Sequence, residues 1–269
     1  MTNVLLLAGM TFKDSIRSKA LYGIFALGFL LFLANILITG MFTWELGKVA
    51  VDVGLSVVSL SGLIIIFFFS IQMVSYDLDR KTIYLILSKP ISKIQYILGK
   101  YLGLATILLI SSIVLGICAV LSFKLATLYH QGYIPENFNW PTFFLSLGYQ
   151  TISLFIVLSI AFLCISVTTH PFTAVLLCMM AYFIGQNVER VIHIMFRNQT
   201  DVHNPALYKL AKTIGWVFPN LAAFDLKTTA AYGLPVDGTY LLWTGIYGIT
   251  YIILCLILAT LIFQRRELG

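Results

Sequence analysis

The chain alternates long uncharged apolar stretches with shorter segments that carry nearly all of its charge. A helix needs about 20 apolar residues to cross the roughly 30 Å hydrocarbon core of a bilayer, whereas barrel strands are about ten residues long and alternate in polarity. The uncharged stretches of helical length are Ala20–Thr43, Val53–Val74, Tyr101–Phe123, Pro141–Val167, Pro171–Val188 and Leu241–Phe263. The pattern therefore predicts an all-α polytopic membrane protein with six transmembrane helices. Only three residues separate the fourth stretch from the fifth, which predicts a tight helical hairpin.

The composition supports the same class. Of 269 residues, 59% are hydrophobic and 10% are charged, and the mean hydropathy is +0.94. A soluble domain has about 45–50% apolar and about 25% charged residues, so a soluble fold is excluded. The 17 Lys and Arg against 11 Asp and Glu give a net charge of +6. We assign this charge to the rim of a membrane protein that faces lipid headgroups, and we expect no nucleic-acid partner.

The distribution of Lys and Arg predicts which side of the membrane each segment faces. With the N-terminus inside, the inner segments carry ten basic residues, and the outer segments apart from the long 189–240 connection carry two. The positive-inside rule then places both termini in the cytoplasm, with the chain in a bacterial cytoplasmic (inner) membrane. The tryptophans agree, because all fall at the predicted outer interface as an aromatic belt would: Trp44, Trp140, Trp216 and Trp243.

The first residues predict a helix that lies on the membrane and does not cross it. Within Asn3–Lys19, five apolar residues fall at helical spacing, while the charged residues gather toward the end of the segment. This pattern is typical of an amphipathic helix on the inner leaflet. A cytoplasmic extension of the first span is the alternative. The apolar positions are Val4, Leu5, Ala8, Phe12 and Ile16.

The connection between the second and third spans, residues 76–100, predicts one short helix followed by a sharp turn. Asp77 or Asp79 can cap that helix, and Pro90 forces a break. Ser92 with Gln95 three residues later forms a capping box that starts the next helix. The Ile and Leu residues of the connection are too few to span and too many for an uncovered loop. Either the protein's own span ends cover them, or a partner docks from the cytoplasm.

The last outer connection, 189–240, is long enough to hold helices of its own. Asn204 and Pro205 predict a helix start, and Pro219-Asn220 predicts its end. A second short helix is expected over Ala222–Ala231, before Pro235. Short helices that dip into the outer leaflet are tolerated when they pack on protein. We therefore expect a re-entrant or interfacial outer segment.

No catalytic motif is present. The sequence contains no G-x-x-x-x-G-K-[ST] phosphate loop, no H-E-x-x-H, no G-x-S-x-G and no paired-cysteine metal motif. We therefore expect no catalytic residue, no metal site and no cofactor in this chain. The four cysteines all lie in predicted spans, where they are expected to be small apolar core residues.

Polar residues inside predicted spans are costly in lipid, so they are candidates for a transport pathway or an outer gate. They are Asn35, Gln72, Gln186, Asn187 and Glu189. Glu189 and His193 are also i, i+4 neighbours, which favours a structural pair at the membrane edge. No carboxylate lies near the middle of a span, and this disfavours a proton-coupled carrier.

In combination, these features resemble the type-2 ABC transporter permeases over nearly the whole chain. The N-terminal segment resembles their elbow helix, the 189–240 connection their outer helical segment with Phe218-Pro219-Asn220, and Arg265-Arg266 their basic C-terminal end. The pattern is also similar to the permease of the copper-maturation ABC system for nitrous oxide reductase. The residues that match the family's cytoplasmic pattern are Asp79, Arg80, Thr82, Leu85, Leu87, Ser88, Pro90, Lys93, Gly99 and Lys100.

The resemblance implies a transport subunit that performs no ATP chemistry itself. Two six-span subunits would pair, with a second copy of this chain favoured over a different permease, and each would bind a separate cytoplasmic ATPase that holds ATP and Mg²⁺. The elbow residues Phe12, Asp14 and Arg17 would contribute to that contact. The ATPase-coupling residues would be Asp79, Arg80, Lys81, Thr82, Ile83, Leu87, Pro90, Ile91 and Lys93.

Two domains follow from this resemblance, an elbow helix over 1–19 and a permease domain over 20–269, whose first, second and fifth spans would line the path between subunits. The leading hypothesis is that the chain is the permease of an exporter. The alternatives are a subunit that transmits ATP-driven motion to an extracytoplasmic partner without moving a substrate, and an ATP-independent membrane carrier. The coupling-type connection disfavours the carrier.

Overall fold

The computed structural model describes residues 2–41, 46–79, 92–129, 138–197, 213, 215 and 217–265. Within these ranges the chain forms helices and turns and contains no strand, which confirms the all-α class. The elements are α1 (Thr2–Arg17), α2 (Lys19–Met41), α3 (Leu46–Ile64), the π-helix η1 (Ile65–Ser70), α4 (Ile71–Asp79), α6 (Lys93–Tyr129), α7 (Trp140–Val167), α8 (Pro171–Arg197), the 3₁₀ turn η2 (Ala222–Phe224), α10 (Lys227–Tyr232) and α11 (Gly238–Arg265).

Five stretches among the described residues are long and apolar enough to cross a membrane. They are Gly47–Asp77, Lys93–Leu125, Trp140–Val167, Pro171–Val191 and Gly238–Arg265. These coincide with the second to sixth predicted spans, so the chain is a multi-pass membrane protein. The first predicted span, Ala20–Thr43, coincides with the helix α2, and the count of six spans stays a prediction.

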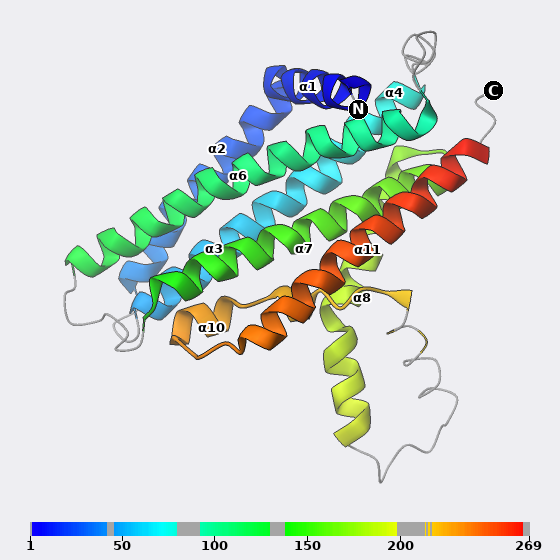
Figure 1. Ribbon diagram of the computed structural model, residues 1–269. Helices are drawn as coiled ribbons and strands as arrows, with labels where there is room; N and C mark the ends of the chain where they lie inside the picture. The colour runs from blue at the N-terminus through cyan, green and yellow to red at the C-terminus, as the bar shows by residue number, and fades with distance from the viewer. Residues whose placement is uncertain are drawn as a thin grey trace.

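The helices α3, α6, α7 and α11 lie side by side, and α6 runs the length of the bundle, whereas the later part of α8 points away from it (Figure 1). Its 37 residues make a helix about 55 Å long at 1.5 Å per residue, which exceeds the roughly 30 Å hydrocarbon core. One or both of its ends must therefore extend past the core. The start of α1 and the end of α11 lie at the end of the bundle where α6 begins (Figure 1).

Burial differs sharply between the spans. The most apolar window of α7 is 72% buried within the chain, whereas those of α8 and α11 are 28% and 22% buried. The helix α7 therefore forms the centre of the fold and packs against α6, α8 and α11. The apolar faces of α8 and α11 point outward, where a soluble protein would place polar residues.

The predicted hairpin is confirmed. The helix α7 ends at Val167, and α8 begins at Pro171, a residue suited to the first helical turn. At the end of α7, the amide and the hydroxyl of Thr168 both donate to the carbonyl of Cys164, at 2.9 and 2.8 Å. The amide bond is the last regular bond of α7, and the hydroxyl adds a second donor to the same carbonyl.

One expectation is wrong. The single helix expected over Ala222–Ala231 is instead η2 followed by α10, because the amide of Asp225 donates to the carbonyl of Ala222 and closes a 3₁₀ turn. Asp77, one of the two residues that could cap the short helix predicted in the 76–100 connection, lies in the last turns of α4, and its carboxylate pairs with Lys100. Residues 80–91 lie outside the described residues, and so does most of the helix predicted to start at Asn204, whose described residues 213, 215 and 217 are helical.

Candidate functional site

The helices α1, α4, α6 and α11 converge at one end of the bundle (Figure 1). The predicted coupling connection leaves this end at Asp79, the last residue of α4, and returns at Lys93, the first residue of α6. The residues that flank the connection are therefore the described part of the candidate site. The remaining coupling residues lie outside the described residues: Arg80, Lys81, Thr82, Ile83, Leu87, Pro90 and Ile91.

The chain re-enters the bundle through the predicted capping box. The amide of Gln95 donates to the hydroxyl oxygen of Ser92 at 3.2 Å, and the amide of Ser92 donates to Oε1 of Gln95 at 3.1 Å. These reciprocal bonds satisfy two backbone donors that the helix itself leaves unpaired. The prediction is confirmed, and the first turn of α6 is fixed by its own sequence.

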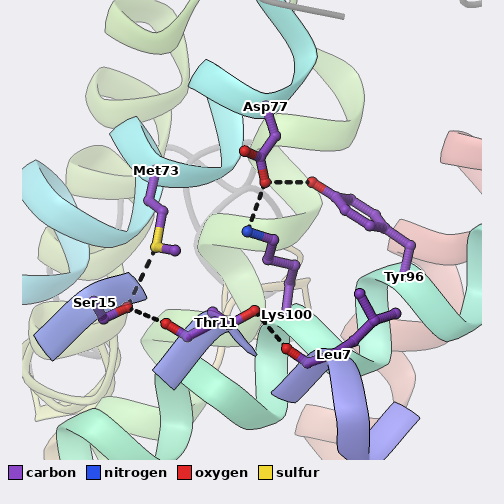
Figure 2. Close-up of polar contacts among 7 residues, drawn as sticks. All are labelled: Leu7, Thr11, Ser15, Met73, Asp77, Tyr96 and Lys100. Carbon is purple, nitrogen blue, oxygen red and sulfur yellow. Dashed lines mark hydrogen bonds and ion pairs between the residues drawn. The ribbon is translucent and has the colours of Figure 1, made fainter. Parts of the chain in front are cut away.

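A buried ion pair joins the two sides of the connection. Nζ of Lys100 on α6 lies 2.6 Å from Oδ2 of Asp77 on α4, and the side chains are 7% and 17% exposed, respectively. The hydroxyl of Tyr96 donates to the same carboxylate oxygen at 3.0 Å (Figure 2). Tyr96 and Lys100 are four residues apart, so both project from one face of α6. Hydrogen bonding of this kind offsets the cost of burying two charges.

The C-terminal end of α11 packs on the same turns of α6. Nζ of Lys93 donates to the carbonyl oxygen of Gln264 at 3.2 Å. The ring of Tyr96 stacks on the ring of Phe263, with centroids 6.2 Å apart and an interplanar angle of 16°. Tyr96 thus contacts α4 through its hydroxyl and α11 through its ring.

The helix α1 crosses α6 on another side, at two glycines four residues apart. A Cβ atom on Gly99 would lie 2.6 Å from Cβ of Leu7, and one on Gly103 would lie 2.6 Å from Cβ of Thr11. Only glycine permits so close an approach of two helices, as in small-xxx-small crossings. The sequence Gly99-Lys100-Tyr101-Leu102-Gly103 therefore fixes where α1 lies.

The face of α1 that meets α6 carries small polar residues whose hydrogen bonds are made locally. Thr11 donates to the carbonyl of Leu7 at 2.9 Å, and Ser15 to that of Thr11 at 2.7 Å. The Ser15 hydroxyl also lies 3.4 Å from the sulfur of Met73 on α4 (Figure 2). These contacts join α1 to α4 as well as to α6.

The predicted elbow residues are divided between two faces. Phe12 packs against the main hydrophobic cluster, whereas Asp14 and Arg17 are exposed. Leu5 and Leu6 are 67% and 64% exposed on the side away from α6. A helix with apolar residues on its outer side suits the surface of a leaflet, and the interfacial position stays a prediction.

The described pathway residues lie on two different helices, α4 and α8. Gln72 is exposed on α4, whereas Gln186 lies 15 residues into α8, about 22 Å along that helix from its start at Pro171. Asn187 donates to the carbonyl of Phe183 at 2.8 Å. The structure describes neither the side chain of Asn35 nor that of His193. The pathway role of these residues stays a prediction.

Glu189 has a partner that the sequence did not indicate. Its Oε2 accepts a hydrogen bond from Nδ2 of Asn220 at 2.9 Å. The amide of Asn220 donates to the hydroxyl oxygen of Tyr247 on α11, at 3.0 Å. Asn220 belongs to the segment between α8 and η2, so these bonds hold the outer segment to the far end of α8 and to α11.

The outer segment is held on the bundle by buried apolar side chains and by hydrogen bonds from tyrosine hydroxyls. Leu221 and Phe224 are fully buried, and a Cβ atom on Gly248 of α11 would lie 2.9 Å from Cζ of Phe224. The hydroxyl of Tyr240 donates to the carbonyl of Ala223 at 3.0 Å, and that of Tyr251 to the carbonyl of Val217 at 3.1 Å. The segment after Pro219 is therefore an integral part of the fold.

Two features of the sequence point to these contacts, although the sequence alone did not predict the partners. Asp77 and Lys100 are the charged residues next to the ends of two consecutive predicted spans, and such residues often meet at a membrane boundary. Gly99 and Gly103 form a small-xxx-small pair at the start of the third span. Neither signal says which helix the residues face.

A bundle in which five of the described helical stretches are long and apolar enough to cross a membrane defines a multi-pass membrane protein. The family model for the ABC-2 family transporter protein matches residues 5–268, and the chain belongs to this family. It is a type-2 ABC permease, and this family implies association with an ABC ATPase. No match to a curated protein was found.

Proposed function

We propose that this chain is the permease subunit of an ABC exporter driven by a separate cytoplasmic ATPase. The observation that carries the proposal is the convergence of α1, α4, α6 and α11 around the two ends of segment 80–91. A docking segment must be connected to the spans if a push on it is to move them, and this segment emerges directly from two of them. The absence of a phosphate loop from the sequence supports a partner that supplies ATP and Mg²⁺.

The ATPase would contact Asp79 to Lys93 together with the exposed side of α1. Ile83, Leu87 and Ile91 would enter an apolar groove, and Arg80, Lys81 and Lys93 would orient the complex against an acidic rim. Apolar contacts buried at the centre of an interface supply most of its affinity, whereas charges at its edge mainly guide association.

The translocation path would run between two copies of the chain. The outward apolar face of α8 and the exposed Gln72 on α4 support a pathway lined by α2, by α3 with α4, and by α8. Gln186, Asn187 and Glu189 would then lie at its outer gate. The charge distribution supports an orientation with both termini in the cytoplasm of a bacterial cell.

The test is copurification of the ATPase from the native membrane. Ile83→Asp or Leu87→Asp would bury an unpaired charge at the interface at a cost of several kcal/mol, roughly. We expect these variants to insert normally but to lose both the ATPase and transport, whereas Lys93→Ala should cost only about 1 kcal/mol. Leu234→Asp makes a similar change at an exposed residue of the outer segment and should retain the ATPase. Retention of ATPase and transport by the Ile83 and Leu87 variants would refute the docking site.

Orientation is tested separately with single cysteines and a membrane-impermeant label in intact cells. Cysteines near Lys19, Lys89 and Glu267 should be protected, and cysteines near Lys48, Glu136 and Asn204 should react. Reaction of a cysteine near Lys89 from outside would place segment 80–91 on the wrong side for a cytoplasmic ATPase.

A second candidate function is transmission of ATP-driven motion to an extracytoplasmic protein, without transport. The packing of the outer segment on α7 and α11 favours this second function, because motion of these helices would reach Asn220 and Phe224 directly. Reconstituted vesicles separate the two functions. In inside-out vesicles, an exporter accumulates substrate. A subunit that only transmits motion accumulates none and acts on its extracytoplasmic partner instead.

A further inference from the structure

We infer that Asp77, Lys100 and Tyr96 are positioning residues that hold the two ends of segment 80–91 in one register, so that a force on the segment moves α4, α6 and α1 together. This inference rests on the proposed function for the source of the force. The positioning itself is a property of the permease alone and can be tested without the ATPase.

The contacts directly link the residues that precede segment 80–91 to those that follow it. Asp77 precedes residue 80 by one helical turn, and Tyr96 and Lys100 follow residue 91 in the first two turns of α6. Oδ2 of Asp77 receives both donors, at 3.0 Å from Tyr96 and 2.6 Å from Lys100 (Figure 2). Because one oxygen accepts both bonds, α4 cannot slide along α6 by a turn without losing both.

The same turns of α6 hold the neighbouring helices. Gly99, next to Lys100, lies against Leu7 of α1, and Tyr96 stacks on Phe263 of α11. A displacement of Asp77 is therefore passed through Lys100 and Tyr96 to helices on two sides of α6.

A charge pair is a poor choice if stability is the only requirement. Replacing a buried ion pair with neutral groups of similar size is often neutral or stabilising, whereas removing one partner leaves a buried unpaired charge. A hydrogen-bonded pair does, however, specify one register, which apolar side chains of similar shape do not. The inference therefore predicts that a variant can keep the stability of the permease and still lose the fixed register of α4 on α6.

Two single variants and their combination distinguish the effect on stability from the effect on register. Asp77→Asn keeps an oxygen that can accept from Tyr96 but removes the charge, and Lys100→Met keeps the length of the chain without its charge. Each single variant should be less stable than the wild type. The double variant Asp77→Asn/Lys100→Met has no unpaired charge, so its unfolding midpoint should return close to that of the wild type.

The first measurement is hydrogen exchange in the isolated, detergent-solubilised permease. Although stable, the double variant should exchange about tenfold faster than the wild type in residues 74–79 and 92–97, the factor that corresponds to the loss of a hydrogen bond to a charged group. Lys100→Arg, which keeps the charge, should exchange at nearly the wild-type rate. Lys124→Met makes the same change at the other end of α6 and should leave these segments unaffected.

The second measurement uses the complex that copurifies with the ATPase. In the wild type, ATP should change the exchange of α1 and α6. In the double variant, the ATPase should remain bound while this ATP response is lost. A stable double variant with wild-type exchange and a wild-type ATP response would overturn the inference. If no ATPase copurifies even with the wild type, the proposed function fails, and the exchange of the isolated permease still decides the positioning role.

Discussion

At the end of the bundle where α4 meets α6, the contacts between helices centre on one buried carboxylate, that of Asp77, and on two glycines of α6. At the opposite end, the stretch 217–240 is held by a buried phenylalanine and by several neutral hydrogen bonds from tyrosines. The first arrangement is concentrated in a few atoms, and the second is distributed over many.

The difference has a physical consequence for mutation and for motion. A buried charge that loses its partner is costly, so a change at Asp77 or Lys100 affects the whole junction. A neutral hydrogen bond contributes about 1 kcal/mol, so the outer segment can lose one and stay attached. A concentrated junction suits a part that transmits force in one register, and a distributed one suits a part that stays in place.

The largest effect is expected from Phe224→Ala, which removes the side chain on which the outer segment is seated. Phe224 is fully buried and packs near the rings of Tyr149 and Tyr247. The cavity left behind should cost about 3–5 kcal/mol of unfolding free energy, measured by thermal or denaturant unfolding in detergent. Trp243→Ala is the control, because Trp243 is 66% exposed on α11. Equal losses in both variants would show that the segment is not seated by Phe224.

The next effect is expected from Gly103→Leu, at the crossing of α1 and α6. Its Cβ atom would lie 2.6 Å from Cβ of Thr11 and 2.8 Å from the backbone oxygen of Ala8, so α1 must move away. Overpacking of this kind costs about 1–3 kcal/mol. Trypsin should then cut faster at Arg17, between α1 and α2. The control is Gly9→Leu on α1, since nothing lies within 4 Å of a Cβ atom there. Unchanged cleavage in Gly103→Leu would mean that α1 is not held by this crossing.

A smaller effect is expected from each tyrosine hydroxyl that bonds the outer segment or the first turn of α11. Tyr149→Phe, Tyr240→Phe and Tyr251→Phe remove bonds of 2.6, 3.0 and 3.1 Å to three different carbonyl oxygens. Each should lower the unfolding free energy by about 0.5–1.5 kcal/mol. Because the attachment is distributed, the triple variant should lose roughly the sum of the three. A triple variant that loses no more than the largest single variant would show that one bond dominates.

The sequence predicted what depends on neighbouring residues. The apolar runs gave the spans, the short interval after Val167 gave the hairpin, and Ser92 with Gln95 gave the start of α6. Each of these features is decided within a few residues of chain, by hydrophobic length or by a local hydrogen bond.

The sequence did not predict contacts between distant residues. Asp77 and Lys100 are 23 residues apart, and their pairing depends on how α4 and α6 are rotated. On α1, apolar spacing pointed to the face of Leu5, yet the glycines of α6 receive Leu7 and Thr11. The π-helix η1 interrupts the predicted second span without a glycine or proline in its sequence. Packing partners decide these features, and a single sequence does not name them.

The smallest effect on stability is expected from Glu189→Gln, at the contact between α8 and the outer segment. The glutamine oxygen can still accept the bond that Asn220 donates to Glu189 at 2.9 Å. Because both residues are at least partly exposed, the lost charge should change the unfolding free energy by about 0.5 kcal/mol or less. Glu189→Ala removes the acceptor as well and should cost about 1 kcal/mol. Transport by the reconstituted complex gives a second readout. If Glu189 lies at the outer gate, Glu189→Gln should alter transport while the unfolding midpoint stays unchanged. Unchanged transport in a stable Glu189→Gln variant would limit the role of the carboxylate to holding Asn220.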